Sequence, residues 1–488
     1  MNKKFNINLK KILLYFYTVV LTVALSNNIV FDRINSADDF QYWTLGVNIS
    51  TSGSYGISSP QNFTGNDRTN PLLNSGQRRG EVLYPLLIST VVKFSLDEKD
   101  LDLLHEECFQ EFLIKNCPLL TKAVFNLNLI VRIFFIISLF IYISNSKLKF
   151  LQDFIILSSL LFALPTYNKD AITYIMLFNF CYFAFKKNKF IPILILSLLP
   201  LINAVFYYFA IFYAVNKVFI VSKNSNFKIQ NLLVVIVLIP SLLWSFRNYQ
   251  ANDEFSISSR GPQLLTIKAE FMYEPSKNLS HAYFWYLPSN DVTSKFKLYL
   301  LENSNLSKTR YLFDRGDSKC IVCRRYEKNG YVFAELQKIY GEQYRNLDEI
   351  LDSENNSKVN SDLLKISLKT FQDDPIKFMY VSSIFFYRGL FPEFMTLAID
   401  NATKLNTVFN IFGSLIRLLL FPYIILLLLV SLFKKNYYIF QSQAVLIFIY
   451  LFTFYSAFTH FIPRYSSVLL PAAVFAYLDI KSKNNSKL

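Results

Sequence analysis

Two adjacent carboxylates follow directly after the first long apolar run of the chain. Asp38 and Asp39 open the stretch "DDFQYWTLGVNISTSGSYG". If residues 40–49 are helical, Asp38 shares a helix face with Tyr42. Asp39 then shares a face with Trp43. Aromatic neighbours exclude water from a carboxylate and raise its proton affinity, which suits a general base acting on a hydroxyl group. The alternative is a solvated helix start, where both carboxylates favour the positive end of the helix dipole.

Charged side chains also stand at the ends of later apolar runs, namely Lys169, Asp170, Arg247 and Arg464. Charges between hydrophobic helices are costly unless they face a cavity or a partner. Arginine offers a planar fork for a phosphate or diphosphate. Two alternatives stay open: a local ion pair between Lys169 and Asp170, and ordinary anchoring of the arginines at a membrane interface.

The elements that position these residues are expected to be membrane helices. The chain has 488 residues, of which 52% are hydrophobic and only 17% are charged. This composition predicts an α-helical polytopic membrane protein, and no basic stretch is combined with a nucleic-acid motif. About ten transmembrane helices are predicted, at residues 11–31, 123–144, 151–166, 170–185, 190–204, 206–221, 229–246, 406–432, 437–459 and 466–480.

Lysine clusters predict how these helices are oriented. With ten spans, every cluster between apolar runs falls on one side together with both termini, and the positive-inside rule makes that side cytoplasmic. The expected modules are an N-terminal transmembrane module at 1–246, with about seven spans and an external loop at 32–122; a large external region at 247–405; and a C-terminal transmembrane module at 406–488, with about three spans. The alternative for the first thirty residues is a secretory signal peptide.

The external loops hold four of the five cysteines, with Cys108 and Cys117 in the first loop and Cys320 and Cys323 in the second. In an oxidising compartment we expect a disulfide within each loop. A zinc site is the alternative, but it needs further ligands, and each loop contains a single histidine.

The segment "RRGEVLYPLLISTVV", residues 78–92, is apolar but short for a span. An interfacial helix lying on the membrane is the natural interpretation. Arg78 and Arg79 would then face lipid phosphates, which requires no catalytic role.

Five segments in order along nearly the whole chain resemble the membrane glycosyltransferases of the C-type (GT-C) fold, the superfamily that includes the protein O-mannosyltransferases and the bacterial aminoarabinose transferases. These segments are "DDFQYWTLGVNISTSGSYG", "LYPLLIST", "TYNKDAITYIMLFNF", "RNYQANDEFSISSRG" and "PRYSSVLLPAAVFA". The chain departs from the family pattern at Gly80-Glu81-Val82, where a proline-rich approach is expected, and at Pro262, where a second glycine is common.

The resemblance implies transfer of a sugar from a polyprenyl-phosphate-linked donor to an acceptor hydroxyl on the external face, with inversion. It makes Asp38 the general base, with Asp39 as the fallback, and allows Asp170 to assist acceptor binding or hold a divalent ion. No other cofactor is implied. The substrate-binding residues expected within the matched segments are Tyr42, Tyr84, Lys169, Asp170, Arg247, Arg464 and Tyr465, and Arg79, just before the second segment, is a further candidate for neutralising the donor phosphate.

The acceptor is a glycan, lipid or protein, and the expected location is a bacterial inner membrane. Two other function classes share many of these features. A lipid-linked polysaccharide polymerase or ligase would have many spans and a large outer loop with arginines, but it does not require the Asp-Tyr helix after the first span. A transporter or flippase typically needs glycine-rich broken helices and charges inside its spans; the chain has only 12 glycines.

Overall fold

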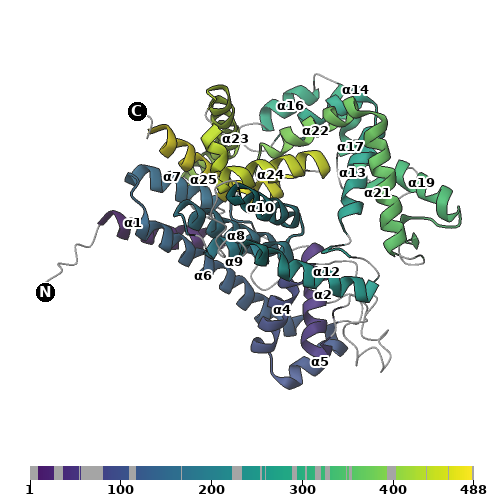
Figure 1. Ribbon diagram of the computed structural model, residues 1–488, viewed down its shortest axis with the longest axis horizontal. Helices are drawn as coiled ribbons and strands as arrows, with labels where there is room; N and C mark the ends of the chain where they lie inside the picture. Colours follow the sequence, from purple (N-terminus) through teal and green to yellow (C-terminus); the bar gives the residue numbers. More distant parts are fainter. Residues whose placement is uncertain are drawn as a thin grey trace.

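The computed structural model describes the chain as an assembly of helices (Figure 1). About 86% of the described part is helical, and that part contains no strands. The described residues are 9–26, 37–53, 55, 81–108, 117–165, 168–188, 190–222, 233–252, 255–258, 260–287, 294–302, 305–313, 320–324, 330–347, 349–350, 354, 356–392, 403–435, 437–459 and 461–485.

Helices occur in each of the ten segments predicted to span a membrane. They are α1 (Leu9–Ser26), α6 (Thr121–Asn145), α7 (Phe150–Phe162), α8 (Asn168–Phe185), α9 (Phe190–Ile202), α10 (Val205–Ser222), α12 (Ile239–Asn252, preceded by the 3-10 helix Leu233–Leu238), α23 (Thr403–Phe433), α24 (Gln443–Phe458) and α25 (Pro463–Asn485). The expected division of the apolar run after Phe190 into two helices is confirmed.

Two helical stretches of the described chain are long and apolar enough to cross a membrane, Pro118–Asn145 and Ile411–Phe433. Both expose large apolar side chains, such as Phe134 and Leu419, which are about 60% exposed. The shorter apolar helices of the described chain, such as Phe150–Phe162 and Gln443–Phe458, have between 10 and 17 residues. The helical class is therefore confirmed, together with two membrane-length helices.

Three of the lysine clusters lie at one end of the bundle. Lys10 of α1 forms an ion pair of 2.9 Å with Asp153 of α7. Lys11 donates a hydrogen bond to the backbone oxygen of Ser144, and Lys186 donates one to the backbone oxygen of Asn145. These contacts bring the N-terminal part of α1, the C-terminal ends of α6 and α8, and the start of α7 together.

The opposite end carries the helices of the two predicted external loops. The first loop contributes α2 (Ala37–Ser52), α4 (Leu83–Ser95), α5 (Glu98–Cys108) and the 3-10 helix Pro118–Leu120. The second contributes α13 (Arg260–Tyr273), α14 (Ser276–Ser280), α15 (Ala282–Trp285), α16 (Ser294–Glu302), the 3-10 helix Asn305–Thr309, α17 (Arg310–Phe313), α18 (Ile321–Arg324), α19 (Tyr331–Tyr340), α21 (Asn356–Asp373) and α22 (Pro375–Gly389). The helices of the second loop, drawn in teal to green, form the group at the upper right of Figure 1. They are here called the outer domain.

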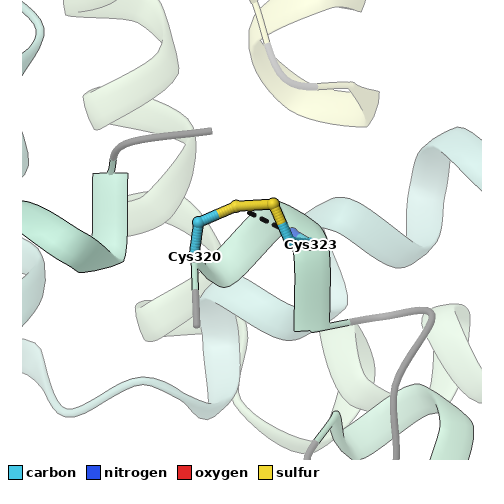
Figure 2. Close-up of a disulfide and its surroundings, with 2 residues drawn as sticks. All are labelled: Cys320 and Cys323. Atoms are coloured by element: carbon cyan, nitrogen blue, oxygen red, sulfur yellow. Dashed lines mark hydrogen bonds between the residues drawn. A yellow bond between two sulfur atoms is a disulfide. The ribbon is translucent and has the colours of Figure 1, made fainter. Parts of the chain in front are cut away.

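The outer domain is built around α13, which packs against α18, α19, α21 and α22. Glu270 of α13 accepts hydrogen bonds from the backbone N–H groups of Tyr331 and Val332, so it caps the start of α19. Cys320 and Cys323 form the predicted disulfide at α18, where the backbone N–H of Cys323 also donates to the Cys320 sulfur (Figure 2). Cys117 is also disulfide-bonded. The side chain of Cys108, its predicted partner, lies outside the described residues.

A buried lysine joins the outer domain to the C-terminal helices. Lys268 of α13 is 0% exposed. Its amino nitrogen lies 2.5 Å from Ser382 Oγ of α22, and 2.8 and 2.5 Å from the backbone oxygens of Ser456 and Ala457 in the last turn of α24. The amino group also lies 4.4 Å from the ring centroid of Phe378. Three helices therefore meet at one nitrogen atom.

This joint should give the protein a specific pH dependence. Burial lowers the pKa of Lys268 from its ordinary 10.5 to about 6. Between these two values the folded protein holds a neutral amine and the unfolded chain an ammonium, so the free energy of unfolding should rise with pH over that range and fall towards pH 6. Lys268→Met should remove this component from the pH dependence of the thermal midpoint of the full-length protein. Lys365→Met, at a side chain that is 73% exposed, is the control and should keep it. An unchanged pH dependence in Lys268→Met would contradict the assignment.

Candidate functional site

The first turn of α8 brings charged residues from distant parts of the chain together. Lys169 lies 2.5 Å from the hydroxyl of Tyr42 in α2, and 4.5 Å from the centroid of the same ring. It also forms an ion pair of 3.4 Å with Glu81. Tyr42 donates to the other oxygen of the Glu81 carboxylate at 3.2 Å. Lysine, tyrosine and glutamate therefore form a closed triangle that is almost entirely buried.

Asp170 faces a different partner. Arg464, in the first turn of α25, approaches Asp170 through its Nε atom at 2.9 Å. The next residue, Tyr465, stacks on Tyr455 of α24 with ring centroids 5.0 Å apart. Adjacent residues on a helix point about 100° apart, so Lys169 and Asp170 face different neighbours. Each charge is paired with a residue from another element: Lys169 with Glu81, and Asp170 with Arg464.

Close packing of α2 on α4 sets the position of Tyr42. A Cβ atom on Gly46 of α2 would lie 2.4 Å from Ile88 Cγ2, so only glycine allows this approach. Tyr84 of α4 is fully buried, and its ring meets the Tyr42 ring edge-on at 5.4 Å. The segment expected to form an interfacial helix is thus helical from Leu83 onwards, and it holds the aromatic wall of the site.

Arg247 lies on α12, which packs against α9. Its guanidinium carbon lies 5.0 Å from the ring centroid of Trp244 and 5.3 Å from that of Tyr55. Tyr55 in turn donates a hydrogen bond to the backbone oxygen of Glu81 at 2.9 Å. Arg247 is therefore linked to the triangle through one tyrosine, and cation–π contacts hold its charge beside the site.

The structure thus brings together seven of the residues predicted from sequence: Tyr42, Tyr84, Lys169, Asp170, Arg247, Arg464 and Tyr465. Asp38 and Asp39 belong to the first turn of α2, which is helical as expected, and their side chains lie outside the described residues. Arg79 also lies outside them. Lys169 and Asp170 occupy the first turn of α8 rather than the connecting turn before it.

Glu81 is the member of the site that sequence reasoning missed. In the sequence, its position is one of those that depart from the C-type pattern. The signal was a carboxylate three residues before Tyr84, at the start of an apolar helix, where an acidic residue needs a partner. Glu81 is only 6% exposed and is held through both its side chain and its backbone.

Asp170, the residue considered for a divalent ion, is paired with Arg464. In the part of the chain that the structure describes, no three side chains of His, Cys, Asp or Glu are grouped so that they could hold a metal ion. A cavity of about 330 Å³ lies elsewhere, in the outer domain, where Tyr273, Arg324 and Tyr331 form part of its lining.

The buried triangle predicts a large cost for removing one charge. In Glu81→Gln, Lys169 loses its carboxylate while it stays buried, which should lower the free energy of unfolding by about 3–5 kcal/mol. The matched control is Glu335→Gln, because Glu335 pairs with the exposed Lys338, and it should cost about 0–1 kcal/mol. Denaturant or thermal unfolding of the two variants checks this. Equal effects would show that the Lys169–Glu81 pair is not buried in the folded protein.

Comparisons with family models, curated proteins and solved structures found no match to this chain. The site therefore rests on the residues and contacts described above.

Proposed function

We propose that the protein is an integral-membrane glycosyltransferase that transfers a sugar from a polyprenyl-phosphate-linked donor to an acceptor hydroxyl. The observation that carries the proposal is the convergence at the first turn of α8. There, residues of the first loop, the α8 start and the α25 start form one largely buried cluster of two cations, two carboxylates and three tyrosines. These are segments in which the sequence resembles the C-type fold.

The location of the cluster also supports the proposal. It lies at the end of α8 opposite to Lys186, which belongs to the end where the lysine clusters gather. In a ten-span arrangement with that end cytoplasmic, the cluster faces the external side of a bacterial inner membrane. The lipid tail of a polyprenyl donor partitions into the bilayer, so its phosphate reaches this depth. There it meets Lys169, Arg247 and Arg464.

The chemistry is an in-line substitution at the anomeric carbon. The acceptor hydroxyl oxygen forms the new glycosidic bond, and the bond between the anomeric carbon and the phosphate oxygen breaks. The electron pair of that bond stays on the polyprenyl phosphate, and the acceptor proton moves to a carboxylate in the first turn of α2. Asp38, one helical turn before Tyr42, is the proposed base, with Asp39 as the fallback. Cations beside the phosphate stabilise the developing negative charge.

Sugar transfer in membranes expressing the protein tests this proposal directly. The donors are a panel of radiolabelled polyprenyl-phosphate sugars, and the variants are Asp38→Asn and Asp39→Asn. Loss of a general base should lower the transfer rate by about 100-fold to 10,000-fold in one of the two variants, with donor binding retained.

Asp373→Asn is the matched control, because Asp373 is exposed at the end of α21. It should transfer sugar at the wild-type rate. Undiminished transfer in both first-turn variants would remove the aspartate pair from the chemistry. An absence of transfer from every donor, even with the wild type, would contradict the transferase itself.

A further inference from the structure

Arg132, inside the bundle, has no partner among the residues that the structure describes. Arg132 lies in the middle of α6 and is only 4% exposed. Its Nε, Nη1 and Nη2 atoms are all buried, and none forms a hydrogen bond. No ion pair or ring contact with another described residue compensates its charge either. A guanidinium carries five N–H donors and stays protonated, so leaving all of them unused is costly.

Neighbouring contacts locate Arg132 along the bundle. Phe135 of α6 meets Tyr174 of α8 with ring centroids 5.8 Å apart, and Asn179 of α8 donates to Ser138 of α6 at 2.9 Å. Because the contacts run in the same order along both helices, α6 and α8 are parallel. Arg132 is three residues before Phe135.

The same register relates Arg132 to the candidate site. Asp170 precedes Tyr174 by four residues, and Arg132 precedes Phe135 by three. Both therefore lie about one helical turn from the Phe135–Tyr174 contact, on the same side of it, and so at similar height along the bundle. Helical side chains tilt towards the N-terminus of their helix. Arg132 therefore tilts towards the end that carries the cluster of Lys169 and Asp170. On its other side, α6 contacts α4 through a hydrogen bond from Asn126 to Ser95.

Charge also separates Arg132 from the other cations of this region. Lys169 is paired with Glu81, and Arg464 is paired with Asp170. The guanidinium of Arg132 has no such carboxylate among the described residues. An anion with several oxygen atoms would satisfy it, and the planar fork matches phosphate oxygens in particular.

We infer that Arg132 binds a phosphate group carried by a membrane lipid, at the height of the cluster of Lys169 and Asp170. An amphiphile is the ligand that fits, because Arg132 lies on a helix of membrane-spanning length, at the height proposed above for the donor phosphate. Polyprenyl phosphate and an ordinary anionic phospholipid both offer this chemistry. Binding of the first would deepen the proposed function, on which that part of the inference rests.

Native mass spectrometry of the full-length protein tests the inference without requiring sugar transfer. The probes are undecaprenyl phosphate and phosphatidylglycerol, each added to protein purified in a neutral detergent. Arg132→Gln should weaken binding of the phosphate lipid at least tenfold, or about 1.4 kcal/mol. Arg132→Lys should weaken it less, because the charge is kept and the fork is lost. Arg345→Gln, at an exposed position, is the control and should bind as the wild type does.

Thermal midpoints provide a second readout that separates a ligand site from a structural arginine. Without lipid, Arg132→Gln should be more stable than the wild type, because an uncompensated buried charge has been removed. With saturating lipid, the order should reverse, since only the wild type gains stability from binding. A variant that is less stable in both conditions, or that binds phosphate lipid as tightly as the wild type, would overturn the inference.

The two lipid arms distinguish the possible sources of the phosphate. Arginine-dependent binding of undecaprenyl phosphate alone identifies the lipid carrier as the ligand, and equal binding of both probes identifies a general headgroup site. Binding of undecaprenyl phosphate without any sugar transfer would contradict the proposed transferase and still support the site. Absence of binding by the wild type to either lipid would overturn the site whether or not transfer occurs.

Discussion

Two opposite charges stand next to each other in the first turn of α8, and the arrangement of the site follows from how each is neutralised. Neighbouring residues on a helix point in different directions, so one partner cannot serve both. Lys169 is met by Glu81 from the first loop, and Asp170 is met by Arg464 from the last helix. The first loop and the last helix therefore both contact the start of α8. If only one of the two pairs formed, the other charge would stay buried without a partner, which would lower the free energy of unfolding.

Shape allows these charges to meet. Gly46 lets α2 lie directly on Ile88 of α4, and Gly389 of α22 lets the ring of Phe461 approach where a Cβ atom would lie only 2.2 Å from it. Phe461 belongs to the turn just before Arg464. The same outer helix, α22, accepts the hydrogen bond of Lys268 through Ser382. The outer domain therefore packs on the segment that carries one member of the site, and its packing and the position of Arg464 are mechanically connected.

The sequence predicted the helices and most of the site because these depend on local signals. Apolar runs locate helices, and charges at the ends of those runs, such as Lys169 and Arg464, stand out because they need partners. Glu81, Arg132 and Lys268 did not stand out. A single charge in or beside an apolar helix is also the pattern of an interfacial anchor, and only the three-dimensional packing shows that each of these side chains is buried. Partner choice likewise depends on how the helices pack, so the sequence alone does not identify Glu81 as the partner of Lys169 or Arg464 as the partner of Asp170.

Lys268 contacts α24 through two backbone oxygens, and this has a consequence for how the chain can vary over evolutionary time. Every amino acid supplies the same backbone carbonyl group. The contact of Lys268 therefore depends on the position of the end of α24 and not on which side chains are there. Substitutions at positions 456 and 457 that keep the helix and its packing leave the contact intact, whereas position 268 has no equivalent freedom. Sequence drift should therefore be strongly asymmetric across this joint, with one side nearly fixed and the other open to change.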